Sequence, residues 1–129
     1  MPYLQLDVAE RYPSDVKRTL ARRLGDLYAE IMVTTPRRVS VGFRELNEGS
    51  LWRCGDGEPE PAAVLMCDIR RGRPIEQRAR LAQALVEACV ETLGLRTDRL
   101  AVEFTQHSGD EMYRDGQFSA DWTSDEVYS

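Results

Sequence analysis

The apolar and polar positions of this chain follow the same order twice. Residues 3–8 and 64–69 are short apolar-rich runs of strand length, and each is followed by a segment with helical spacing. A segment of alternating polarity closes each half, with Val39, Val41 and Phe43 in the first and Leu100, Val102 and Phe104 in the second. Each half is therefore predicted to form a strand, a helix and a second strand.

The first helix is predicted from about Asp15 to Met32. Ser14 stands directly before it, and serine is a preferred N-cap residue. Spacing of 3.6 residues places one set of apolar side chains on a common face, made of Val16, Leu20, Leu24, Leu27 and Ile31.

The second helix is predicted to start after Pro74 and to end near Gly94. Proline suits the first helical turn and glycine suits the C-cap, so both ends carry a signal. The apolar stripe expected to face the sheet consists of Ile75, Ala79, Ala82, Val86, Cys89 and Leu93.

An internal repeat supports this division of the chain. Ten residues are identical when the chain is shifted by 61 positions, whereas about two or three identities are expected by chance. The identical pairs are Leu4/Leu65, Asp7/Asp68, Pro13/Pro74, Leu20/Leu81, Ala21/Ala82, Leu24/Leu85, Glu30/Glu91, Arg38/Arg99, Val41/Val102 and Phe43/Phe104. The sequence therefore predicts a duplicated unit.

Two right-handed β-α-β units give a four-stranded sheet with both helices on one face, which is an α+β (α/β sandwich) fold. We expect a single domain over residues 1–129. Its parts are a first repeat at 2–45, a connecting hairpin at 46–62, a second repeat at 63–105 and a C-terminal tail at 106–129.

The sheet face without helices is predicted to carry apolar side chains. Tyr3, Leu65 and Cys67 are among the apolar residues available on the two faces of the strands. A large exposed apolar surface is unusual in a monomer, so an obligate oligomer is expected.

Composition excludes several classes of protein. A net charge of −5 argues against a protein that gains affinity for nucleic acid by neutralising phosphates. The sequence holds no apolar run near the ~20 residues of a membrane span and no N-terminal signal-peptide pattern, so a soluble cytoplasmic protein is expected. The odd number of cysteines, without a CxxC pair, favours reduced thiols over disulfides or a metal site.

Pro2 is the first candidate for chemistry. Removal of Met1 would leave the Pro2 nitrogen as a free secondary amine at the end of a buried strand. An α-amino group titrates near 8, and desolvation or nearby cations would keep it neutral and able to carry protons. A proline is also tolerated at a strand start for structural reasons alone.

A basic turn is the second candidate. Arg70 and Arg73 lie where the third strand ends and the second helix begins, and their paired donors suit one carboxylate. The alternative is a solvated turn in which the arginines pair with Asp68 and Glu76. Arg71 is expected to point elsewhere.

Together, the N-terminal proline, the duplicated β-α-β units and the Arg-Arg-Gly-Arg turn resemble the tautomerase superfamily, specifically its cis-3-chloroacrylic acid dehalogenase-like branch. The resemblance covers most of residues 2–118, including Val41–Glu45, Glu48–Ser50, Leu81–Gln83, Met112, Gly116 and Phe118. It implies a homotrimer that uses no metal or organic cofactor. It also implies that Pro2 is a general acid or base and that Arg70 and Arg73 bind the substrate carboxylate.

The sequence departs from this branch at three positions. Tyr28 stands where the dehalogenase has a substrate-binding histidine, and Glu103 and Arg114 stand where it has the residues that activate water. Tyr28 is expected either to donate a hydrogen bond to the substrate or to pack. Glu103 and Arg114 are expected to form an ion pair that lines the pocket, and Glu111 or Asp115 is the remaining candidate for a water-activating base.

The sequence thus predicts a tautomerase that acts on a small 2-oxo or 2-hydroxy-unsaturated carboxylate. Keto-enol isomerisation requires only one group that moves a proton and cations that stabilise an enolate. One alternative is hydration, dehalogenation or decarboxylation of a three-carbon acid such as a 3-haloacrylate or malonate semialdehyde. The other is a trimeric binding scaffold without turnover.

Overall fold

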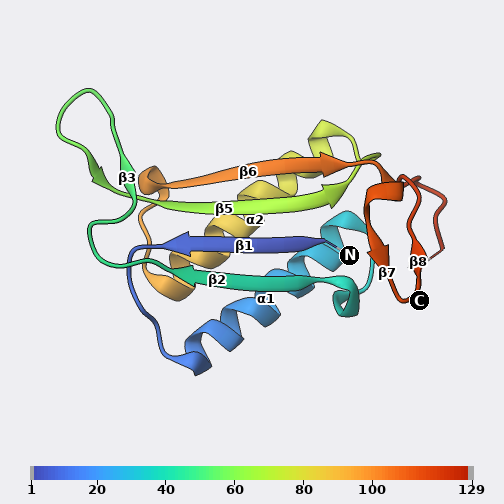
Figure 1. The fold of residues 1–129 in the computed structure, drawn as a ribbon, viewed down its shortest axis with the longest axis horizontal. Coiled ribbons are helices and arrows are strands. Elements are labelled where there is room, and N and C mark those ends of the chain that lie inside the picture. The colour runs from blue at the N-terminus through green and yellow to red at the C-terminus, as the bar shows by residue number, and fades with distance from the viewer. Residues whose placement is uncertain (1, 128–129) are drawn as a thin grey trace.

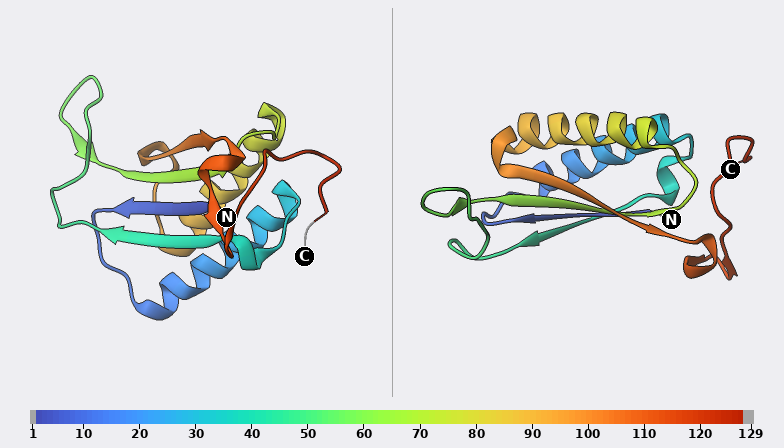
Figure 2. Two further views of the ribbon diagram at one scale, coloured as in Figure 1. Left: turned by 45° about the vertical axis from the view of Figure 1, so that its right-hand side comes forward. Right: turned by 90° about the horizontal axis from the view of Figure 1, so that it is seen from above.

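The computed structural model describes residues 2–127. Met1, whose removal the amine chemistry requires, lies outside the described residues. The main sheet has the order β2-β1-β5-β6 and is formed by Tyr3–Val8 (β1), Ser40–Glu45 (β2), Ala63–Arg70 (β5) and Leu100–His107 (β6). Helices Ser14–Met32 (α1) and Ile75–Leu93 (α2) cover one face of it (Figure 1; Figure 2, right).

Short elements join and extend these units. Three 3-10 helices are Pro36–Arg38 (η1), Thr97–Arg99 (η2) and Gly109–Glu111 (η3). Two small hairpins are formed by Trp52–Arg53 (β3) with Glu60–Pro61 (β4), and by Tyr113–Arg114 (β7) with Gln117–Phe118 (β8). The first hairpin lies at one end of the sheet, and the second lies at the opposite end together with the N-terminal end of β1 (Figure 1).

The two halves of the chain have the same structure. Helices α1 and α2 begin 61 residues apart and end 61 residues apart, as do η1 and η2. Strand β1 is parallel to β2, β5 is parallel to β6, and the antiparallel pair β1–β5 joins the halves. The predicted fold of duplicated β-α-β units with both helices on one face is confirmed.

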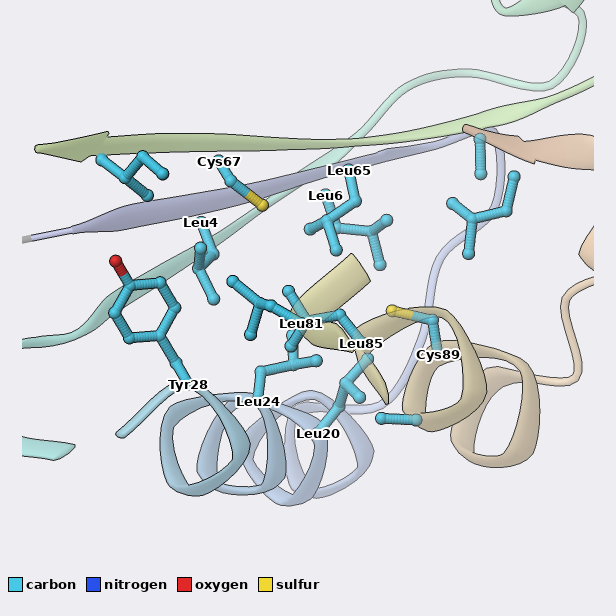
Figure 3. Packing of buried hydrophobic residues seen from close by; sticks show 14 of the residues in the cluster. Leu4, Leu6, Leu20, Leu24, Tyr28, Leu65, Cys67, Leu81, Leu85 and Cys89 are labelled. Atoms are coloured by element: carbon cyan, nitrogen blue, oxygen red, sulfur yellow. The ribbon is translucent and has the colours of Figure 1, made fainter. Parts of the chain in front are cut away.

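The core lies between the sheet and the two helices. Every second residue of β1 and β5 points toward the helices, and Leu4, Leu6, Leu65 and Cys67 are fully buried there. Helix α1 contributes residues at intervals of four, which place Leu20, Leu24 and Tyr28 on its inner face (Figure 3).

The predicted inner stripe of α2 is wrong in its first half. Ile75 is 59% exposed and Ala79 is also exposed, whereas Leu81 and Leu85, which lay outside the predicted stripe, are fully buried. Only part of the stripe is confirmed, because Cys89 is fully buried and Val86 and Leu93 pack against the core. Helix α2 carries two apolar arcs, and periodicity cannot tell which of them faces the sheet.

No helix within residues 2–127 has the length and apolar character needed to cross a membrane.

The helix ends agree only in part with the sequence signals. Ser14 is the first helical residue of α1, and Pro13 occupies the cap position that was expected for Ser14. Gly94 caps α2 as predicted, with a left-handed φ of 72°. Its counterpart 61 residues earlier is Val33, which adopts the same conformation at φ 55° although its branched side chain disfavours it.

The prediction of an apolar open face is also wrong. Leu65 and Cys67 point into the core, and residues that alternate with them carry mostly polar side chains to the helix-free face. These open-face residues are Tyr3, Gln5, Asp7, Ser40, Gly42, Arg44, Val64, Met66, Asp68, Ala101, Glu103, Thr105 and His107. A one-residue difference in register exchanges the two faces of a strand, and the apolar content of β5 did not fix that register.

Candidate active site

Pro2 lies at the start of β1, where the strand ladder fixes its position. The backbone carbonyl of Pro2 accepts a hydrogen bond from the Ser40 amide at 3.1 Å, and the residue is buried. A small cavity beside it is lined by Pro2, Tyr28, Thr34, Arg38, Arg70 and Arg73. Its volume of about 10 Å³ holds about one water molecule.

Arg70 ends β5 at the edge of this cavity, and its side chain is only 10% exposed. Its Nη1 donates to the carbonyl oxygen of Ala120 at 2.7 Å and to Glu126 Oε1 at 2.8 Å. Its Nη2 donates to Glu126 Oε2 at 2.7 Å. A carboxylate of the chain itself is therefore bound by the guanidinium fork of Arg70.

Arg73 approaches the same cavity from the turn before α2. Gly72 makes this turn with a φ of 129°, a conformation that residues with side chains rarely adopt. The Nε of Arg73 donates at 2.9 Å to the carbonyl oxygen of Met32, which the end of α1 leaves without a helical partner. The guanidinium carbon lies 5.9 Å from the ring centre of Tyr28 and 4.9 Å from that of Trp122. Burial lowers the pKa of Arg73, but an arginine in this position remains a cation.

Tyr28 belongs to the core and to the cavity at once. The residue is 1% exposed and its ring packs in the core (Figure 3). It also forms part of the cavity wall with Pro2. Burial raises the pKa of its hydroxyl to about 12, although Arg73 partly opposes this shift. The hydroxyl is consequently protonated near neutral pH, and both expected roles of Tyr28 fit its position.

Sequence reasoning missed Arg38 as a site residue. It is the last residue of η1, and its side chain enters the cavity next to Arg70 and Arg73. The Arg38 Nε is buried and has no hydrogen-bond partner among the described residues. Burial and the neighbouring cations, chiefly Arg114, lower the pKa of Arg38. Its identity with Arg99 in the internal repeat was the only signal in the sequence.

The remaining predicted residues lie outside this cavity. Arg114 lines an adjacent cavity of about 200 Å³ together with Arg38, Arg70 and Glu126. Its Nε is 3.6 Å from Asp115 Oδ2. Glu103 is exposed on the open face of β6. The expected Glu103–Arg114 ion pair is therefore not formed within residues 2–127 of one chain.

Comparison with solved structures identifies the fold. No family model matches the sequence, and no curated protein matches it. Pt0534 inactivated by 2-oxo-3-pentynoate has a TM-score of 0.80 and 25% identity, over 92% of this chain and 95% of its own. N1, a member of the cis-3-chloroacrylic acid dehalogenase family, has a TM-score of 0.80 and 23% identity, over 92% of this chain and 84% of its own. A fused 4-OT symmetric trimer has a TM-score of 0.81 and 20% identity, over 92% of this chain and 95% of its own.

The chain has the tautomerase-superfamily fold. The predicted resemblance is confirmed at this level. In this tautomerase fold the duplication creates a related position at the other end of the sheet, because residues 61 apart occupy equivalent places.

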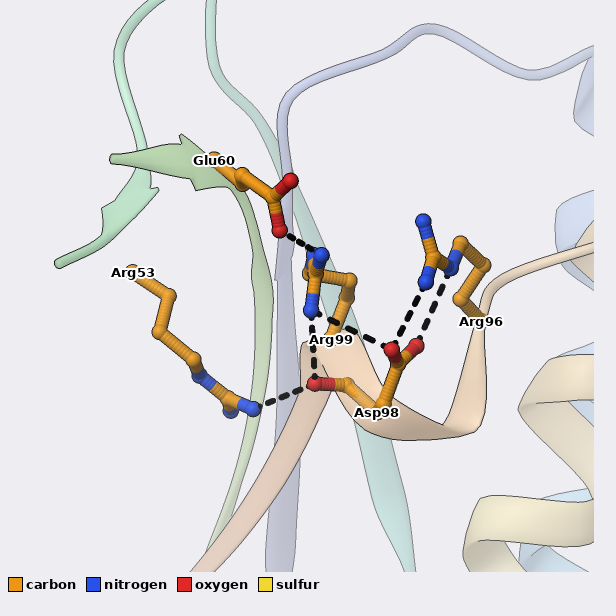
Figure 4. Close-up of polar contacts among 5 residues, drawn as sticks. All are labelled: Arg53, Glu60, Arg96, Asp98 and Arg99. Atoms are coloured by element: carbon orange, nitrogen blue, oxygen red, sulfur yellow. Dashed lines mark hydrogen bonds and ion pairs between the residues drawn. The ribbon is translucent and has the colours of Figure 1, made fainter. Parts of the chain in front are cut away.

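The second end lacks the chemistry of the first. Ala63 is the counterpart of Pro2 and is joined to its neighbours by ordinary peptide bonds, so it offers no amine. Arg99 is the counterpart of Arg38, but its guanidinium pairs with Glu60 and Asp98 (Figure 4). Ala9 lies where Arg70 lies in the other half. Within residues 2–127, Pro2 and the three arginines that line its cavity therefore come together at one end of the sheet, and the other end has no equivalent set.

Proposed function

We propose that the protein is a cofactor-independent tautomerase that isomerises a small 2-oxo or 2-hydroxy-unsaturated carboxylate between its enol and keto forms. One observation carries this proposal. Pro2 shares a small, buried cavity with the guanidinium groups of Arg38, Arg70 and Arg73. An amine that moves a proton and cations that bind an anion are the two requirements of the reaction.

The proton transfer follows from this arrangement. Three nearby positive charges and burial both favour the neutral form of the Pro2 amine, which is the form that accepts a proton. The nitrogen takes the proton of the substrate 2-hydroxyl, the electron pair of the broken O–H bond forms the carbonyl, and the electrons of the enol double bond form a new C–H bond at the neighbouring carbon. Pro2 then returns the proton to that carbon.

The arginines and Tyr28 have separate tasks in this proposal. Arg70 and Arg73 hold the carboxylate, and the Nε of Arg38, which has no partner within residues 2–127, donates to the oxygen that becomes negative in the transition state. Tyr28 presents a protonated hydroxyl at the cavity wall as a further donor. Arg114 lines the adjacent cavity of about 200 Å³ and adds positive potential on that side of the arginines.

The arrangement within one chain favours proton transfer over hydration or dehalogenation. Both of those reactions require a base directed at water as well as an acid directed at carbon. Arg114 is a cation, and Glu103 lies on the open sheet face away from the cavity. Substrate binding by Glu103 would require a neighbouring chain.

We also propose that the chain assembles as a homotrimer. A fused 4-OT with the same fold is a symmetric trimer. The partly apolar groove between α2 and β6, lined by Ala82, Val86, Val90 and Val102, is one surface available for contact between chains. Sedimentation equilibrium checks this, and a stable monomer at micromolar concentration contradicts it.

The decisive experiment combines N-terminal analysis with kinetics. Mass spectrometry of the native protein should show Pro2 as the first residue, and wild type should ketonise enol pyruvates in a spectrophotometric assay. Pro2→Ala should lose activity because a primary amine differs in basicity and geometry, and Arg73→Ala should lose it with the carboxylate contact. Equal rates in all three proteins would rule out the proposed site.

Covalent labelling gives an independent measurement. Pt0534 is inactivated by 2-oxo-3-pentynoate, a small 2-oxo acid with an electrophilic triple bond. Incubation of this protein with the same reagent should add its mass to the N-terminal peptide through the Pro2 nitrogen. Labelling of cysteine alone, without loss of activity, would contradict the assignment of Pro2.

A further inference from the structure

The C-terminal tail has an anchored part beside the cavity. The Ser119 amide donates to the carbonyl oxygen of Met112 at 2.9 Å, and the Trp122 amide donates to that of Arg71 at 2.8 Å. A side chain at Gly72 or Gly109 would collide with the tail backbone, so both glycines allow its close approach. The ring of Trp122 is buried and covers Arg73. Residues 119–122 are therefore fixed to the body of the protein.

The next residues are held in a different way. Glu126 donates its amide to the carbonyl oxygen of Thr123 at 3.1 Å, and the Thr123 hydroxyl lies 2.7 Å from Asp125 Oδ1, so the segment 123–127 forms its own turn. Within residues 2–127, the hydrogen bonds and ion pairs that join this turn to the body all end on the Glu126 carboxylate. Release of this carboxylate would remove the polar contacts that join the turn to the rest of residues 2–127, while the contacts of Trp122 stayed in place.

That carboxylate binds as a substrate carboxylate would. Its two oxygens accept from both Nη atoms of Arg70 at 2.8 and 2.7 Å, and Oε2 lies 3.6 Å from Nη1 of Arg38. The same edge of Arg70 cannot bind a second carboxylate in this bidentate geometry while Glu126 is present. The cavity next to Pro2 also holds only about one water molecule in this closed arrangement.

We propose that Glu126 is a tethered competitor for the carboxylate position on Arg70, and that the segment 123–127 is a strap that opens when a substrate carboxylate replaces it. The inference rests on the proposed function, since it takes Arg70 as the group that binds the substrate. The exchange replaces one carboxylate with another, so Arg70 is never left buried without a counter-charge. Only molecules with an open strap bind substrate, so the apparent affinity is the intrinsic affinity multiplied by the fraction of molecules that are open.

The kinetic test uses three variants of the full-length protein. Glu126→Gln removes the charge that competes for Arg70, and a chain that ends after Trp122 removes the whole strap. Asp125→Asn is the matched control, because it removes one negative charge from the same turn and leaves the Arg70 contact intact. We expect KM to fall about tenfold in the first two variants and to stay unchanged in Asp125→Asn.

Binding of pyruvate, measured by calorimetry with the same four proteins, separates this inference from the proposed function. Pyruvate is a small 2-oxo carboxylate, and its affinity should rise about tenfold in Glu126→Gln and in the truncated chain. If no protein isomerises an enol acid but this rise is observed, the proposed function fails and the strap stands. Equal affinities in all four proteins, no pyruvate binding at all, or weaker binding after loss of Glu126 would each overturn the strap.

Discussion

Arg73→Met separates the chemistry of a buried cation from its effect on stability. Methionine keeps the length and packing of the side chain but removes the charge and the hydrogen-bond donors. Because Arg73 as a residue is 5% exposed and shares a cavity with Arg38 and Arg70, its charge is costly to bury and is repelled by its neighbours. The lowered pKa of Arg73, caused mainly by burial, has the same origin.

The contributions to stability oppose each other. The Nε hydrogen bond to the Met32 carbonyl contributes about 1.5–3 kcal/mol, as expected for a charged donor, and each ring contact contributes about 0.5–2 kcal/mol. Desolvation of a buried cation costs several kcal/mol. The terms are similar in size, so we expect Arg73→Met to change the free energy of unfolding by less than about 1.5 kcal/mol.

The effect on activity has no such compensation. Loss of one partner of a buried charged contact costs about 2–5 kcal/mol, so kcat/KM should fall about 30-fold or more. Urea denaturation and enol pyruvate kinetics measure the two effects. Arg71→Met is the matched control, since Arg71 lies in the same turn, is exposed, and contacts His107 and Trp122 through backbone atoms. The reasoning would be refuted if Arg71→Met lost as much activity, or if Arg73→Met kept full kcat/KM.

Three further predictions concern the backbone, the strap and the thiols. Val33→Gly should raise the free energy of unfolding by about 0.5–1 kcal/mol in urea denaturation, because it relieves a left-handed valine, and Gly94→Val should lower it; opposite signs would show that these positions are not strained. The ion pair with Arg70 keeps the pKa of Glu126 below its ordinary value, so its stabilising contact is complete above that ordinary value and is lost as pH falls through the lowered pKa. Hydrogen exchange of residues 123–127 should therefore be slower than in Glu126→Gln near pH 6 and equal to it once Glu126 is protonated, whereas a constant ratio would contradict this. Cys54 is exposed, while burial raises the pKa of the other two thiols to about 12, so iodoacetamide should label one thiol in the native protein and three in denaturant; native labelling of a second thiol would contradict the structure.

The order of elements was predictable because it depends on local patterns. The spacing of apolar residues and the 61-residue repeat predicted the first and last residues of both helices to within about one residue, because this spacing reflects the geometry of each element. Pro2, Tyr28, Arg70 and Arg73 were also chosen from the sequence, and the strand and helix ends that carry them converge on one cavity. Their catalytic roles remain predictions.

The faces of the elements were less predictable. Helix α2 carries apolar side chains on two arcs, so Ile75 and Leu81 were equally plausible inner residues until packing chose Leu81. The same holds for β5, where only the register against β1 placed Leu65 inside and Met66 outside.

The sequence by itself determined the duplicated β-α-β fold and the proline and arginines of the candidate site. Only the tertiary structure decided that Arg38 joins them and that Glu126 binds Arg70 across 56 residues of chain. Local periodicity fixes which residues share an element, because that depends on backbone geometry alone. Which distant side chains meet depends on how the elements and the tail pack together, and no local pattern encodes that.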